Sequence, residues 1–123
     1  MKVWRFCQFL LLGVKLRQSL KRCNGAFANI CNGCLTGADL KSTVLLKARY
    51  DDSTVVDPKT ALILDLSNSG GAGRNLESQD LSDAVLAGLD LSNANLKNTT
   101  MDRTSLERCN LSGSDLTDAS FRH

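Results

Sequence analysis

A large apolar residue recurs at every fifth position through the second half of this chain of 123 residues. Between residues 76 and 121 the spacing has no exception. The residues concerned are Leu76, Leu81, Leu86, Leu91, Leu96, Met101, Leu106, Leu111, Leu116 and Phe121. An earlier run keeps the same spacing over Ile30, Leu35, Leu40, Leu45, Tyr50 and Val55. We predict that the later run, together with Leu40 and Leu45, forms a ladder of core residues.

Neither regular secondary-structure period accounts for this spacing. On an α-helix a step of five residues rotates each apolar side chain by about 140° from the last, so the series would spread over all faces. A flat strand would need apolar residues two positions apart. A backbone that turns a corner every five residues returns each of them to the same side. The run therefore predicts a coiled chain.

The positions beside each apolar residue agree with such a coil. The residue two positions earlier is usually small, as at Ala94, and strand alternation places both on the same side. The residue between them is often Asp or Asn and is predicted to face water, and the remaining two are types that suit corners. Four residues depart from this pattern and predict an irregular stretch over residues 74–90, with a bulge at Leu89. They are Arg74, Gln79, Val85 and Leu89.

Three segments carry a family resemblance. Gly37-Ala38-Asp39-Leu40, Asn93-Ala94-Asn95-Leu96 and Gly113-Ser114-Asp115-Leu116 closely resemble the pentapeptide-repeat family, whose unit reads A(D/N)LxX. The resemblance covers residues 28–56 and 74–123, and we assign residues 23–56 and 74–123 to two repeat blocks. It implies an all-β solenoid, a right-handed quadrilateral β-helix with four pentapeptides per turn and with the large and small residues inside.

The segment between the two blocks, residues 57–73, predicts a short inserted helix. Asp57 followed by Pro58 is typical of a helix start, because Asp caps the first turn and Pro suits the first helical position. Gly70 and Gly71 supply a stop. We therefore expect a helix over residues 58–68 that returns to the coil through a turn over residues 70–73.

Residues 1–22 form a basic and apolar leader with six Lys or Arg and no acidic residue, whereas the rest of the chain has nine against thirteen. Its apolar run, residues 6–14, is shorter than the roughly 20 residues that span a bilayer. Three interpretations remain open. The segment is a helix that caps the coil, a secretory signal cleaved near residues 26–28, or an interfacial anchor that contacts a membrane through residues 3–14. We expect the first, an N-terminal helix.

The five cysteines indicate a compartment. Their odd number and irregular spacing are unlike a secreted disulfide framework, so a reducing compartment and a cytoplasmic location are expected. A membrane-associated, periplasmic or thylakoid-lumen location is the alternative if the leader is a signal or an anchor.

Little in the sequence predicts catalysis. The only histidine is the last residue, His123, which disfavours a catalytic triad or a histidine metal site. Cys31 and Cys34 form a CxxC, a weak candidate for half a zinc site or a redox pair, with no second CxxC to complete it. The glycine-rich residues 69–74 lack the ending of a phosphate loop. We expect no cofactor and no enzymatic activity.

The repeat and the scarcity of catalytic groups together predict a non-catalytic scaffold for protein–protein interaction, with a protein partner and no nucleic acid. Two other classes remain open: a DNA-mimicking protein that interacts with a topoisomerase, as the resemblance implies for some family members, and a membrane-associated or lumenal structural protein. An uncapped last turn at Phe121 also suggests a homodimer formed by end-to-end stacking.

Overall fold

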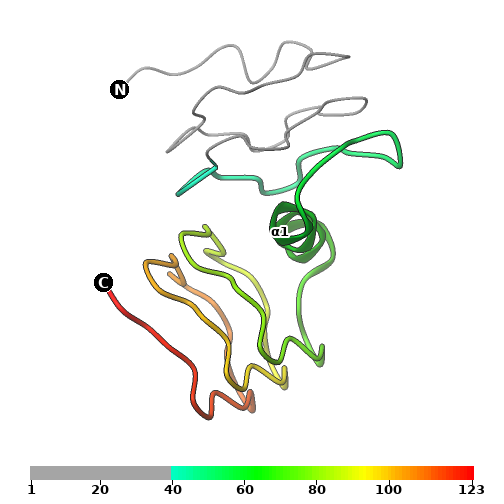
Figure 1. Ribbon diagram of the computed structural model, residues 1–123. Coiled ribbons are helices and arrows are strands. Elements are labelled where there is room, and N and C mark those ends of the chain that lie inside the picture. Colours follow the sequence, from blue (N-terminus) through cyan, green and yellow to red (C-terminus); the bar gives the residue numbers. More distant parts are fainter. Residues whose placement is uncertain (1–39) are drawn as a thin grey trace. The chain divides into compact units, whose positions relative to one another are not determined.

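The computed structural model describes residues 40–123. The chain divides into two compact units, Met1–Asn68 and Ser69–His123. The predicted leader, the N-terminal helix and the start of the first repeat block lie outside the described residues. One α-helix, α1, spans Pro58–Ser69 (Figure 1).

Helix α1 begins and ends where its sequence predicts. The Ala61 N–H donates to the Asp57 carbonyl at 2.9 Å. This bond closes the first helical turn, in which Pro58 is the first helical residue. At the other end Gly70 has a φ of +75°, a left-handed conformation that glycine adopts without steric cost and that ends helices. The helix over residues 58–68 was therefore predicted to within one residue. Leu64 and Leu66 are fully buried.

The described part of the first unit holds α1 against the first repeat block. The Asn68 side chain donates to the Ala48 carbonyl at 3.1 Å and to the Leu64 carbonyl at 2.9 Å. The Lys47 ammonium donates to the Asn68 carbonyl at 3.1 Å. The last turn of the helix is thus bonded to residues twenty and twenty-one positions earlier in the chain.

The five-residue period breaks inside this block. Turns close from Leu40 to Thr43 and from Leu45 to Ala48, but the next turn closes from Asp51, six residues after Leu45. Because of the extra residue, Tyr50 and Val55 are 41% and 53% exposed and do not continue the buried series, although they keep the five-residue spacing in the sequence. Leu45 is buried as predicted and Leu40 is half-buried. The phase of the coil therefore shifts by one residue between Leu45 and Asp51.

In the second unit the chain coils with a register of twenty residues. Parallel bridges join Asn75 to Asn95, Asp80 to Thr100, Val85 to Ser105, Asp90 to Asn110, Asn95 to Asp115 and Thr100 to Ser120. Each layer both donates backbone hydrogen bonds to the next layer and accepts them from it. For example, the Leu86 N–H donates to the Ser105 carbonyl and the Ser105 N–H donates to the Ala84 carbonyl, each at 2.9 Å. Four hydrogen-bonded turns separate Asn75 from Asn95. One circuit therefore contains four five-residue units.

Each corner of this coil is a β-turn. The N–H of the fourth residue donates to the carbonyl of the first, as from Ala94 to Leu91 at 3.2 Å, and the third residue has a positive φ. That single positive φ is typical of a type II turn. Non-glycine residues occupy most of these positions, namely Ser78, Asp83, Asn93, Asn98, Arg103, Arg108 and Asp118. The turn that starts at Asp51 has no positive φ, in line with its different spacing.

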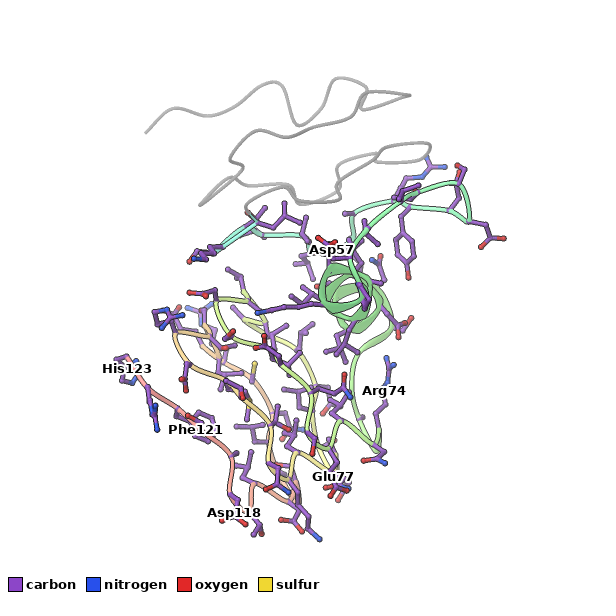
Figure 2. All side chains as sticks on the ribbon, in the orientation of Figure 1. Asp57, Arg74, Glu77, Asp118, Phe121 and His123 are labelled. Atoms are coloured by element: carbon purple, nitrogen blue, oxygen red, sulfur yellow. The ribbon has the colours of Figure 1, made fainter. Side chains whose placement is uncertain are left out.

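The predicted core ladder of the second unit is buried through its first half and opens toward its end. Leu76, Leu81, Leu86, Leu91, Leu96 and Met101 are at most 2% exposed. Leu106, Leu111 and Leu116 are half-buried. Phe121 is 43% exposed, so the prediction that it is a core residue is wrong (Figure 2). The last bridged residue is Ser120, and within the described chain no further layer covers Phe121.

The small inward position has a second role that the sequence pattern does not reveal. Thr99, Thr104 and Cys109 donate to the carbonyls of Leu76, Leu81 and Leu86 at 3.1, 2.7 and 2.9 Å. Each donor therefore bonds to the carbonyl twenty-three residues earlier, in the neighbouring layer. Burial raises the pKa of the Cys109 thiol, which keeps it protonated and able to donate.

The departures predicted to disturb residues 74–90 do not interrupt the register. Leu89 is buried at 8% exposure, and the bridge from Asp90 to Asn110 directly after it is in register, so the predicted bulge is absent. The residue one layer on from Leu89 is the smaller Cys109, which leaves room for it. Pairing with the next layer starts at Gly71, three residues earlier than predicted.

Candidate binding surface

The outward side chains of the second unit lie in four columns, each named here by its bridged residues. These are the Asn75–Asn95–Asp115, Asp80–Thr100–Ser120, Val85–Ser105 and Asp90–Asn110 columns. Each column also includes two turn residues from every layer, which are the second and third residues after the bridged residue. Because residues in a column are twenty apart, the bridges place their backbones at the spacing of neighbouring β-strands, about 4.8 Å.

Outward Asp and Asn residues cap the turns that follow them. The side-chain Oδ1 of Asp80 accepts from the Ser82 N–H at 2.9 Å, that of Asp90 from the Ser92 N–H at 3.0 Å, and that of Asp115 from the Thr117 N–H at 3.0 Å. Asn75, Asn95 and Asn110 accept in the same way. The sequence predicted only that these residues face water. Their recurrence has a structural cause, because each satisfies an N–H that the turn leaves without a backbone partner.

The same residues also bond along the columns. The Asn95 amide donates to the Asn75 side-chain oxygen and to the Glu77 carboxylate, both at 3.0 Å. The Asn110 amide donates to the Asp90 carboxylate at 3.2 Å. These side chains are therefore held in fixed positions on the surface.

Two ion pairs continue this pattern. The Arg103 guanidinium makes a bidentate pair with Asp83, at 2.7 and 2.9 Å, and the hydrogen bond to Asp83 raises the pKa of Arg103. Lys97 lies 3.1 Å from the Asp115 carboxylate. Because all four side chains reach solvent, each pair adds order more than stability.

Hydrogen bonds depress the pKa of three carboxyl groups in these columns. The Thr117 hydroxyl and N–H, followed by Lys97, lower the pKa of Asp115 to about 2. The Ser120 hydroxyl and the Arg122 N–H lower the pKa of Asp102, and Ser92 lowers the pKa of Asp90. All three are therefore charged at neutral pH and engaged as acceptors.

The Val85–Ser105 column differs from the other three. It consists of Val85, Ala87 and Gly88 from one layer and of Ser105, Glu107 and Arg108 from the next. Among the described residues its side chains make no hydrogen bond or ion pair, whereas every other column is linked by them. Val85 and Ala87 are half-exposed, and Glu107 and Arg108 are exposed.

The sites considered from the sequence are placed as follows. Cys31 and Cys34 lie outside the described residues. The glycine-rich stretch after α1 is the helix end and the first turn of the coil, with the Arg74 N–H donating to the Gly71 carbonyl at 3.1 Å. Over residues 40–123 no group of three His, Cys, Asp or Glu residues is arranged to hold a metal ion, and no helix has the length and apolar character needed to cross a membrane.

The family model of pentapeptide repeats matches residues 80–118 as eight copies. A search of curated proteins found no match.

Proposed function

We propose that this chain, whose residues 80–118 are pentapeptide repeats, is a non-catalytic scaffold that binds a protein partner on the outer surface of a right-handed, four-sided coil. The observation that carries the proposal is the ordering of its outward side chains. Turn caps, amide ladders and ion pairs fix most of them before any partner arrives. A surface prepared in this way loses little conformational entropy on binding.

The chemistry of three described carboxylates supports a non-catalytic role. A general acid or base at neutral pH needs a pKa near 7. The pKa values of Asp90, Asp102 and Asp115 are instead lowered, because Asp90 and Asp115 accept hydrogen bonds from the turns that follow them and Asp102 accepts from Ser120 and Arg122 of the neighbouring layer. These carboxylates stabilise the surface, and the surface is the functional part.

The proposal is tested by capture of a partner with three immobilised full-length baits. They are the wild type, Leu86→Asp, which places a charge in the fully buried core and should disrupt the coil, and Thr100→Ala, which trims a half-buried outward side chain. We expect the same protein on the wild-type and Thr100→Ala baits and none on Leu86→Asp.

Two results would count against the scaffold. One is equal capture by the Leu86→Asp bait, because binding would then not need the folded coil. The other is turnover of a substrate by the purified wild type that Leu86→Asp abolishes.

A further inference from the structure

The Val85–Ser105 column combines an apolar pair with an unpaired acid and base. Val85 is the only apolar residue at a bridged position between residues 75 and 120, and Ala87 follows it at the next turn. The register of twenty residues places Glu107 and Arg108 one layer away, in the corresponding turn. Between residues 40 and 123 neither charge has an ion-pair partner, although Lys97 and Arg103 in other columns do.

The order of the two charges makes this surface complementary to itself. A two-fold axis through an interface brings residue i of one copy to residue j of the other, and j to i. If the axis passes between Glu107 and Arg108, each Glu107 meets the Arg108 of the second copy. Ala87 is one layer from Glu107 and so stays near this axis, whereas the Val85 residues of the two copies lie on opposite sides of it, at the edge of the contact. No column that has already paired its charges offers this arrangement.

We propose that a second copy of this chain binds on the Val85–Ser105 column, forming a two-fold dimer in which Glu107 pairs with Arg108 across the interface. This inference rests on the proposed function in that it takes the outer surface to be where the coil binds proteins. It differs from end-to-end stacking through Phe121, because the two coils lie side by side. The column has only two described layers, so the dimer is weak and forms at high protein concentration.

Charge-reversal variants of the full chain test this arrangement by sedimentation velocity. Glu107→Arg places two Arg–Arg contacts in the dimer, and Arg108→Glu places two Glu–Glu contacts. We expect each single variant to weaken dimerisation about tenfold or more. Mixing the two variants restores opposite charges at both contacts, so the mixture forms a heterodimer about as tight as the wild-type dimer.

The matched control is Asp118→Arg, which reverses a charge at the same turn position in the Asn75–Asn95–Asp115 column. It should dimerise like the wild type, and far-ultraviolet circular dichroism should show the same fold for all variants. A mixture of Glu107→Arg and Arg108→Glu that stays monomeric overturns the proposal, as does a wild type that is monomeric at millimolar concentration. Loss of the dimer in Phe121→Glu, with the two charge variants unaffected, also overturns it in favour of end-to-end stacking.

These outcomes are separable from those of the proposed function. A monomeric wild type that still captures a protein partner sinks the dimer and leaves the scaffold intact. Dimerisation without capture of another protein supports the dimer alone.

Discussion

At each corner of the coil one residue has a left-handed backbone, whichever side chain it carries. Ser78, Asn98 and Arg103 adopt φ values of 55° to 58° there, and Gly88 adopts 76°. Such a conformation costs an L-residue roughly 1–2 kcal/mol, and more when the side chain is β-branched. Polar and charged residues at these corners are therefore tolerated because the layers on either side hold the turn.

This cost is measurable at Gly88. A Cβ built there has no atom within 4 Å, so a substitution tests backbone strain without a steric clash. We expect Gly88→Val to lower the free energy of unfolding by about 1–2 kcal/mol, measured by urea denaturation. Asn98→Gly, the reverse exchange at an equivalent corner, should leave stability unchanged within about 0.5 kcal/mol or raise it. A neutral Gly88→Val would mean that the corner is not left-handed.

Asp115 gives the coil a defined response to acid. Its pKa in the folded chain is about 2, below the ordinary value of 3.8, because the charged form accepts bonds from Thr117 and Lys97. Because the pKa of Asp115 is lower in the folded chain than in the unfolded chain, its charged form stabilises the fold fully above pH 4. That stabilisation is lost as the pH falls toward the pKa of the folded chain. Thermal unfolding between pH 2 and pH 7 should show a decline below pH 4.

The matched variant for this effect is Asp115→Asn, which retains the capping oxygen without the charge. Its melting temperature should fall less between pH 4 and pH 2 than that of the wild type. An identical acid response in both proteins would show that Asp115 does not contribute.

At the scale of the element, α1 depends on one amide at its C-terminal end. Asn68 bonds both to Leu64 within the helix and to Ala48 in the repeat block. We expect Asn68→Ala to destabilise the first unit by about 1–2 kcal/mol, since two hydrogen bonds are lost. Ser69→Ala, at an exposed neighbouring position, should have little effect in the same denaturation experiment. Equal effects of the two substitutions would remove Asn68 from this role.

The sequence predicts this element well and the segment before it poorly. Asp57, Pro58 and Gly70 are local signals whose physical cause lies within a few residues, so the helix bounds follow from them. Tyr50 and Val55 keep the five-residue spacing in the sequence and yet lie outside the core. The chain inserts an extra residue before the turn at Asp51, and nothing local to Tyr50 marks that insertion.

At the scale of the molecule, stability should decline along the coil with the burial of the ladder. Leu86 is fully buried, whereas Leu116 is half-buried. We expect Leu86→Ala to cost about 2–5 kcal/mol and Leu116→Ala less than half of that, by urea denaturation of the full chain. The same cost at both positions would mean that the last layer is as well covered as the middle one.

The five-residue period and the twenty-residue register are predicted from different features of the sequence. Ten apolar residues at a fixed interval show that the backbone turns every five residues, but they do not say how many corners close one circuit. That number came from the family resemblance, and the bridges between residues twenty apart support it. The binding surface is harder to predict. Val85, Glu107 and Arg108 differ from other outward residues because their side chains make no hydrogen bond or ion pair to a neighbouring layer, and this depends on the register.

The register of twenty residues is the central claim, and nuclear Overhauser contacts test it directly. In uniformly labelled protein, the amide of Leu86 should show contacts to Ser105 and Leu106, and the amide of Leu76 to Asn95 and Leu96. Across residues 71–123 every such long-range contact should join residues about twenty apart. A helical pattern of contacts between residues four apart throughout this segment, or a separation that changes from layer to layer, would contradict the coil.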